Sequence, residues 1–246
     1  MVIQRREGHR VRLPAAVSIA ADGRRSTLAF SLGLSRHPAR PRRWAAGAYF
    51  EHVAGLGSRG EMHVRRSFCL GVAPLPGGLA NACLVSADRG WFRDPGEALR
   101  RAIASDAWLR ERFAAARRVS PVAVMGPLAV ESTGAGLPGL LLAGDAAGFI
   151  DPMTGDGLRF AMRGAELAAR AALSMLETGS PAHGRLAVWR RQEFALKWRL
   201  NRALSRLVAS PAGIRAAGVV ASILPAAFER LIDIAGDVAL AGRARA

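Results

Sequence analysis

The sequence predicts an α/β (α+β) fold in which a buried parallel strand and a separate antiparallel sheet belong to one chain of 246 residues. Three observations support this prediction. The apolar run GLLLAGD (139–145) is typical of a strand buried on both faces, and a helical pattern follows it. Residues 44–86 contain short strand-like runs separated by Gly and Pro. The C-terminal part of the chain has long helical patterns.

The N-terminal residues predict one strand and one short helix. The run AAVSIAADG (15–23) is apolar and ends in Asp-Gly, which indicates a strand that enters a turn. The next segment, 24–34, has the pattern of one or two helical turns, and the proline-broken basic segment 36–44 is typical of a linker. Residues 1–17 lack the continuous apolar core of a signal peptide.

The middle of the chain predicts an antiparallel sheet and one helix. The strand-like runs are WAAGAYFEHV (44–53), EMHVRRSFCLGV (61–72) and LANACLVSA (79–87), and PLPGG (74–78) makes a turn between two of them. Segment 94–118 has a proline near its start, apolar residues at helical spacing and arginines at its end. It therefore predicts a single helix.

The remaining segments predict extended structure and then helices. Residues 121–132 return to an extended pattern, a helix is expected from Gly157 to about Met175, and a basic amphipathic helix from Leu186 to Leu207. The tail after it is expected to be helical too. Small residues of the first helix are expected to let it pack closely on the sheet: Gly164, Ala165, Ala168 and Ala169.

The composition is strongly basic, with a net charge of +16 that is carried almost wholly by arginine. A basic protein can meet nucleic acid, an anionic membrane surface or an acidic ligand. Because no recognised nucleic-acid module accompanies the charge, we interpret it as arginine on solvated faces and expect no nucleic-acid partner. Cys69 and Cys83 have no metal-ligand spacing and are expected to be small buried side chains, which favours a cytoplasmic location.

Asp145 stands where the buried strand ends, and ligands of parallel sheets bind at the carboxyl ends of strands. Its carboxylate can accept hydrogen bonds from sugar-like hydroxyls, and Ala146, Ala147 and Gly148 leave room for a ligand chain. The glycine pair that follows lets an anionic or electron-rich ligand approach a helix N-terminus. An alternative interpretation of Gly-Asp alone is a tight strand–turn–helix joint capped by Asp145.

The whole run G-D-A-A-G-x-x-D-P-x-x-G-x-G (144–157) is much more specific than Gly-Asp. It resembles the second flavin motif of FAD-dependent oxidoreductases of the geranylgeranyl reductase / aromatic-ring hydroxylase (flavin monooxygenase) superfamily. The resemblance implies that Asp145 binds the ribityl chain of FAD and that the backbone of 155–158 approaches the pyrimidine edge of the flavin ring. It implies these cofactor-binding residues: Gly144, Asp145, Ala146, Gly148, Asp151, Pro152, Gly155, Asp156, Gly157 and Leu158.

Two further stretches are similar to this superfamily, so the resemblance spans about residues 17–176. ADGRRS (21–26) is similar to the motif G-A-D-G-x-x-S, with Ala20 in place of its first glycine. This similarity implies that Asp22 and Gly23 lie near the FAD pyrophosphate, where the following arginines could also meet phosphate. GVAPLPGGLANACLV (71–85) is similar to a hairpin of the reductase substrate domain, without its usual aromatic residues.

The superfamily begins with a strand, a G-x-G-x-x-G turn and a helix that hold the FAD pyrophosphate. Two stretches of this chain match the glycine pattern, GLGSRG (55–60) and GAGLPG (134–139), but each precedes a strand-like run instead of a helix. We therefore expect an incomplete FAD/NAD(P)-binding Rossmann-like domain with an inserted antiparallel-sheet substrate domain and a C-terminal helical region.

This resemblance implies four segments along the chain. They are a remnant of the FAD-binding domain (1–43), the substrate domain with one helix (44–128), the FAD-binding strand–turn–helix (129–178) and the C-terminal helices (179–246). Without the first nucleotide-binding unit, the chain alone is expected to bind FAD weakly or not at all. Another chain could supply that unit.

The function that the resemblance implies is that of an FAD-dependent oxidoreductase with NAD(P)H as the electron donor. It would be a reductase or a monooxygenase of a hydrophobic or aromatic small molecule, and the sequence leaves both open. No catalytic residue is assigned and no metal site is expected. His52, His63 and Tyr49 lie in the predicted substrate sheet, where such residues are more often packed or exposed than catalytic.

Two alternatives come from other classes: a non-catalytic remnant or partner subunit of a flavoprotein, and a basic nucleic-acid-binding protein. A separate hypothesis concerns segment 185–208, in which Trp189, Phe194, Trp198 and Leu200 accompany many arginines. This pattern suits an interfacial helix and peripheral membrane contact. The alternative is a helix packed across the sheet with its arginines in solvent.

Overall fold

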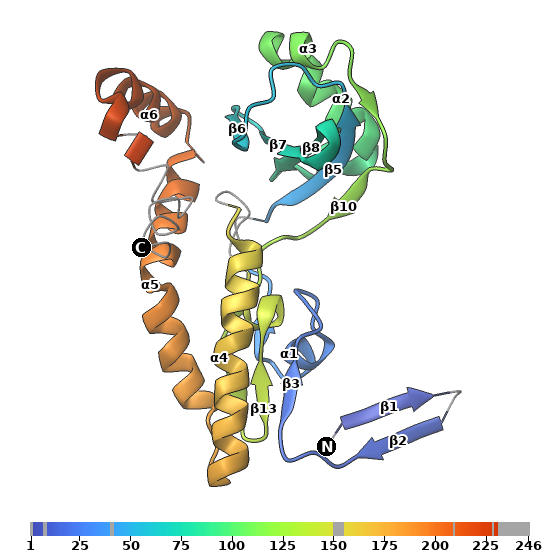
Figure 1. The fold of residues 1–246 in the computed structure, drawn as a ribbon, viewed down its shortest axis with the longest axis vertical. Helices are drawn as coiled ribbons and strands as arrows, with labels where there is room; N and C mark the ends of the chain where they lie inside the picture. The colour runs from blue at the N-terminus through green and yellow to red at the C-terminus, as the bar shows by residue number, and fades with distance from the viewer. Residues whose placement is uncertain are drawn as a thin grey trace. The chain divides into compact units, whose positions relative to one another are not determined.

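The fold is that of a computed structural model, which describes residues 2–6, 9–39, 42–149, 155–208, 210–227 and 229–230 (Figure 1). The chain divides into two compact units. Unit 1 contains the described residues of Met1–Pro38, Val130–Leu204 and Ala226–Ala246, and unit 2 those of Ala39–Ala129 and Ser205–Pro225. The fold is mixed α/β, as predicted.

A three-stranded sheet forms the centre of unit 1, in the order β12 (Gly136–Leu137), β13 (Leu140–Leu142) and β3 (Ser18–Ala20). Strand β13 runs parallel to β3, and its three leucines are buried. The prediction of a buried parallel strand is therefore confirmed, and the strand predicted in 15–23 is present as β3. Helix α1 (Thr27–Ser31) follows β3 as the predicted short helix.

Two smaller strand pairs also belong to unit 1. Strands β4 (Ser35–Arg36) and β11 (Glu131–Ser132) pair antiparallel. An N-terminal hairpin of β1 (Val2–Arg6) and β2 (His9–Leu13) was not predicted. Its residues alternate basic and apolar side chains only loosely, so the period of a strand is weak there.

Helices α4 (Gly157–Thr178) and α5 (His183–Val208) confirm the two predicted C-terminal helices. Ala168 of α4 is buried in one hydrophobic cluster with Leu141 and Ala143 at the sheet, as the small-residue prediction requires, whereas buried Gly164 lies against the Arg190 guanidinium of α5. Ala165 and Ala169 are exposed, because they lie one residue beyond the buried face of the helix. Helix α6 (Pro211–Ile223) follows α5 and is capped by Ser210.

Unit 2 contains the predicted antiparallel sheet. Its strands are β5 (Trp44–Glu51), β6 (Glu61–Val64), β7 (Cys69–Leu75), β8 (Leu79–Ser86) and β10 (Ala123–Met125), in the order β10-β5-β8-β7-β6. A short 3-10 turn, η1 (Pro76–Gly78), joins β7 to β8 as predicted. Cys69 is buried, Cys83 is partly buried, and no disulfide joins them.

The prediction of one helix over 94–118 is wrong, because this segment forms two helices and a strand. Helix α2 (Pro95–Ala104) ends at Ser105, and α3 (Ala107–Arg112) begins anew because the Asp106 carboxylate accepts a hydrogen bond from the backbone N–H of Leu109, at 3.1 Å. The final arginines form strand β9 (Arg117–Arg118), which pairs with β5. Another short 3-10 segment, η2 (Arg89–Arg93), precedes α2.

Candidate functional site

The parallel pairing of β3 and β13 brings the two predicted flavin motifs together. The backbone N–H of Ala143 donates to the carbonyl of Ala20 at 2.9 Å, at the last step of the pairing. Because parallel strands end at the same edge of a sheet, Asp22 and Asp145 follow neighbouring strand ends. The candidate site is this edge of unit 1.

The Asp-Gly turn after β3 is held by its own hydrogen bonds. The Asp22 carboxylate accepts from the backbone N–H of Thr27 at 2.9 Å, and the N–H of Ser26 donates to the Gly23 carbonyl at 2.9 Å. Gly23 has φ +82°, and a Cβ there would meet nothing within 4 Å. The turn therefore requires glycine for its backbone conformation and presents open space beside it.

The turn after β13 is a short 3-10 helix, η3 (Gly144–Ala147), and two of its carbonyl groups accept hydrogen bonds from side chains of other segments. The Ser35 hydroxyl donates to the carbonyl of Ala146 at 3.3 Å, and the Arg190 guanidinium donates to that of Ala147 at 2.8 Å. Ala146 and Ala147 are buried. Gly148 ends the turn with φ +111°, a conformation that favours glycine.

Asp145 is half-buried on this turn, and no hydrogen bond to its carboxylate is present among the residues that the structure describes. The cap position of η3 is Ala143 and that of α4 is Asp156, so Asp145 caps neither helix. The alternative interpretation of Asp145 as a helix cap is therefore wrong. Its acceptor oxygens are available to a ligand.

The charges of the two motifs act on each other. Burial raises the pKa of the Asp145 carboxyl, and the positive charge of Arg24 opposes that rise without cancelling it. Burial also lowers the pKa of Arg24, as does its neighbour Arg25, while Asp145 raises it. The Asp-Gly turn therefore supplies a positive charge close enough to act on the aspartate of the other motif.

Replacing Asp145 by asparagine is expected to stabilise unit 1 near neutral pH. The raised pKa means that the ionised carboxylate costs stability above the pKa of an unfolded aspartate, about 3.9. We expect Asp145→Asn to raise Tm by about 1–2 °C at pH 7 and to leave it unchanged at pH 3, where both side chains are neutral. Thermal unfolding at both pH values, with the exposed carboxylate variant Glu177→Gln as the charge-matched control, measures this. A lower Tm for Asp145→Asn at pH 7 would contradict it.

The N-terminus of α4 is the third part of the candidate site. Gly155 has φ +71° with open space at its Cβ position, and the Asp156 side chain makes no cap hydrogen bond to α4. Leu158 is 80% exposed. Gly157 lies against Phe149, since an added Cβ would lie 3.0 Å from the phenyl ring. The predicted site residues Asp151 and Pro152 lie outside the described residues.

The buried face of α5 carries three polar residues that the sequence reasoning missed. Arg190, Lys197 and Asn201 are buried at helical spacing in one stripe with apolar Leu186 and Phe194. One Nη of Arg190 has no hydrogen-bond partner among the described residues, and burial lowers the pKa of Arg190 to about 10. The Lys197 ammonium lies 3.4 Å from Asp156. The sequence contains a signal for the burial of Arg190, because this residue stands midway between two apolar residues, Leu186 and Phe194, of one helical stripe.

The aromatic residues of α5 face the core of unit 1. Phe194 is buried, and Trp189 and Trp198 pack against the same hydrophobic cluster. The rings of Phe160 and Phe194 meet edge to face at 5.1 Å. In the part of the chain that the structure describes, no helix is both long and apolar enough to cross a membrane. Peripheral membrane contact of this helix stays a prediction.

Of the remaining sequence candidates, His63, Tyr49 and the glycine pattern at 55–60 lie in unit 2, and the glycine pattern at 134–139 lies in unit 1. His63 is buried with its Nε2 3.0 Å from the Glu61 carboxylate, and burial lowers its pKa, as expected of a packed histidine. Tyr49 is exposed. The glycine pattern at 55–60 leads into β6, and the other, at 134–139, contains β12 and leads into β13. Neither precedes a helix, so neither has the setting of a phosphate-binding turn.

The fold occurs in solved flavoproteins. A triple mutant of the flavin-dependent brominase Bmp2 matches 95% of this chain with a TM-score of 0.77 and 16% identity, over 60% of its own length. A flavoprotein/dehydrogenase from Cytophaga hutchinsonii matches 82% of the chain with a TM-score of 0.71 and 19% identity, over 51% of its length. The flavin-dependent halogenase CmlS matches 80% with a TM-score of 0.70 and 19% identity, over 37% of its length.

No family model matches the chain. Among curated proteins, a segment of 44 residues is 48% identical to conditioned medium factor receptor 1 of Dictyostelium discoideum, covering 18% of this chain and 9% of that protein. This segment is too short to carry a relationship. The chain spans less than two thirds of the length of the flavoproteins above. It has, over that part of their length, the fold of flavin-dependent halogenases and related flavoproteins.

Proposed function

We propose that this chain carries the flavin-ring half of the FAD site of an oxidoreductase. The observation that carries the proposal is the half-buried Asp145 carboxylate, which has no hydrogen-bond donor among the described residues and lies at the shared end of two parallel strands. The halogenase PltM, a structure of the same fold, was solved in complex with phloroglucinol and FAD. That likeness supports a flavin as the ligand.

The residues of the edge suit the chemistry of such a group. Asp145 would accept hydrogen bonds from ribityl hydroxyls, which are donors. Gly144 and Gly148 have φ +58° and +111°, conformations that favour glycine, so neither position adds a side chain to the turn. Asp22, Gly23 and Arg24 would lie toward the pyrophosphate, where the guanidinium can pair with a phosphate oxygen.

The start of α4 would face the pyrimidine edge of the flavin. When bound, the flavin supplies the redox chemistry. The chain supplies position and charge: the first N–H groups of a helix carry partial positive charge, which stabilises negative charge nearby. Buried Lys197 lies 3.4 Å from Asp156 at the same helix end, so its ammonium offsets the negative charge of that carboxylate.

The reaction class follows from the same proposal. NAD(P)H would donate the electrons, and the substrate would be a hydrophobic or aromatic small molecule that is reduced or oxygenated. The names of the structural neighbours add halogenation to these chemistries. A second chain or segment with a G-x-G-x-x-G turn would complete the site for the adenosine half of FAD.

A site that holds only the flavin-ring half of FAD, here called the half-site, predicts which flavins bind. Because the described edge addresses the ring, the ribityl chain and the first phosphate, FMN and FAD should bind this 246-residue chain with Kd values within about threefold of each other, and riboflavin, which has no phosphate to pair with Arg24, should bind more weakly. Asp145→Ala should weaken all three by about tenfold, since it removes hydrogen bonds to a charged acceptor. Quenching of flavin fluorescence measures the three Kd values.

The control is Glu177→Ala, which removes an exposed carboxylate from the far end of α4 and should change no Kd. Circular dichroism of both variants checks that the fold is intact. A sub-micromolar Kd for FAD together with much weaker FMN binding would contradict the half-site. Flavin binding that is indifferent to Asp145→Ala would overturn the assignment of Asp145.

A further inference from the structure

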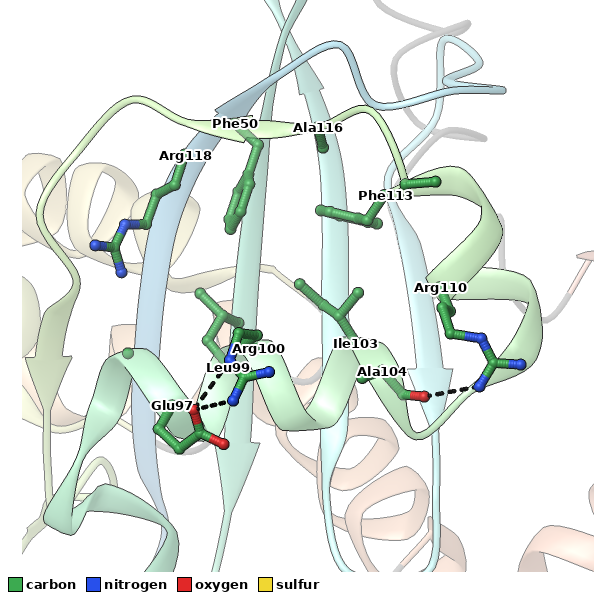
Figure 2. A pocket seen from close by; sticks show the side chains of 12 residues that line it. Phe50, Glu97, Leu99, Arg100, Ile103, Ala104, Arg110, Phe113, Ala116 and Arg118 are labelled. Carbon is green, nitrogen blue, oxygen red and sulfur yellow. Dashed lines mark hydrogen bonds and ion pairs between the residues drawn. The ribbon is translucent and has the colours of Figure 1, made fainter.

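Unit 2 contains a pocket of about 740 Å³ beside helices α2 and α3 (Figure 2). It is lined by the end of β5, by both helices and by the segment that follows α3. Volumes of a few hundred to about a thousand Å³ are typical of small-molecule sites. Neither of the flavin motifs contributes to this pocket, so its use is independent of the proposed flavin site.

The inner wall of the pocket is apolar. The rings of Phe50 and Phe113 meet edge to face, with centroids 5.3 Å apart, and Leu99 and Ile103 of α2 lie across from them (Figure 2). Leu99, Ile103 and Phe113 belong to the buried core of unit 2, with Phe50 packed against it. This wall can take an alkyl chain or an aromatic ring out of water, a gain of about 25 cal/mol per Å² buried.

The rim is cationic. Arg100 already pairs with Glu97, whose carboxylate accepts from its Nε at 3.0 Å and from its Nη2 at 2.5 Å. Arg110 donates only to the backbone carbonyl of Ala104, at 3.3 Å, and no ion pair involves Arg110 or Arg118 among the described residues. Figure 2 shows these two guanidinium groups on opposite sides of the pocket. The lining therefore has two positive charges that no carboxylate of the described chain balances.

An apolar wall beneath unpaired guanidinium groups fits an amphiphilic anion. A carboxylate matches the planar fork of arginine and can accept two of its hydrogen bonds. A cation would be repelled by the rim, and a compact polyanion would leave the Phe50–Phe113 wall without a partner. We propose that this pocket binds a free hydrophobic monocarboxylate, with its apolar body on that wall and its carboxylate at Arg110 or Arg118.

Titration calorimetry of the 246-residue chain with decanoate at low salt tests the proposal. Saturable binding is expected, and decyltrimethylammonium, which has the same chain and the opposite charge, should not bind. The double variant Arg110→Gln/Arg118→Gln should weaken decanoate about tenfold, because it removes both charge-assisted partners. Both arginines are exposed, so these substitutions leave the core untouched.

A second variant tests the cavity itself. Ala114 is exposed and lines the pocket, so Ala114→Trp should obstruct it and weaken decanoate without entering the core. The matched control is Arg93→Gln, an exposed arginine of unit 2 outside the lining, which should stay within about twofold of the parent chain. Thermal unfolding confirms that each variant is folded.

Several outcomes would overturn the proposal. Decanoate binding that neither variant changes would place the ligand elsewhere, and equal binding of the ammonium probe would show a merely apolar surface. If decanoate does not bind, while the double variant lowers co-sedimentation with phosphatidylglycerol vesicles, the arginines meet a lipid surface and the free-carboxylate assignment fails. Absence of any saturable decanoate binding also overturns it.

Discussion

Gly136→Ala is expected to destabilise unit 1 by about 2–4 kcal/mol, because the chain has no room for a side chain at this position of β12, which pairs with Leu141 of β13. A Cβ at Gly136 would overlap the carbonyl oxygen of Leu140 and lie 3.0 Å from its carbonyl carbon. The obstacle is backbone, so no side chain can rotate away. Gly136 also has φ +145°, which an L-residue rarely adopts.

Equilibrium urea unfolding measures this loss as a lower midpoint. The matched control is Gly134→Ala, two residues earlier, where the nearest heavy atom to an added Cβ is the Gly136 carbonyl oxygen at 4.0 Å. That variant should change the free energy of unfolding by less than about 1 kcal/mol. Since β13 positions Asp145, Gly136→Ala should also abolish flavin quenching. Equal stability of the two variants would contradict the described strand connection.

Arg112→Met is expected to destabilise unit 2 by about 3–5 kcal/mol, the usual cost of breaking a buried ion pair on one side. The Arg112 side chain is only 5% exposed. Its guanidinium donates to both Glu61 carboxylate oxygens, at 2.5 and 2.9 Å, and to the carbonyl groups of Ala54 and Gly55, at 2.8 and 3.0 Å. It also lies 4.7 Å from the ring centre of Trp108. Methionine fills the volume but removes this donor from both carbonyl groups and leaves Glu61 with His63 as its partner.

The comparison variant is Arg100→Met, which removes an exposed guanidinium from a pair with Glu97 and should cost less than about 1 kcal/mol. Urea unfolding of both variants gives the difference. A double-mutant cycle with Glu61→Met isolates the pair, since removing both partners should cost less than the sum of the single changes. An additive cycle would mean that Arg112 acts independently of Glu61, through packing and its hydrogen bonds to the carbonyl groups of Ala54 and Gly55.

Acid sensitivity provides a second readout of the same pair. The hydrogen bond from Arg112 is the main cause that lowers the pKa of Glu61. A lowered folded-state pKa stabilises the fold above the pKa of an unfolded glutamate, about 4.3, and this contribution is lost as pH falls through the lowered value. The parent chain should therefore lose more stability than Arg112→Met between pH 5 and pH 3, both about one unit from that reference.

Short-range patterns predicted the elements that depend on local composition. The three leucines of β13 are recognisable because a strand buried on both faces needs an unbroken apolar run. The division of segment 94–118 into two helices could not be recognised, because the residues on both sides of Ser105 have helical periodicity. The break depends on Asp106, whose carboxylate both caps α3 and pairs with Arg65, 41 positions earlier. Long-range contacts of this kind leave no periodic trace.

The residues of the candidate site were likewise predictable only where a local motif contains them. A motif identified Asp22 and Asp145 separately, each with its glycine neighbours. The action of Arg24 on Asp145 and the support of the turn by Ser35 and Arg190 depend on strands and helices that meet only after folding. Arginine is ordinarily exposed, so burial of Arg190 overrides the residue's usual preference.

The hydrogen bond from Ser35 to the turn at Ala146 joins residues 111 positions apart. A ribosome adds roughly 5–20 residues per second, so about 6–22 s of synthesis separate the two. During that interval all the strands of the unit 2 sheet, which lie between Trp44 and Met125, are synthesised, whereas β13, the partner of β3 among the described residues, is not yet made. The insert can therefore fold before β3 and β13 pair.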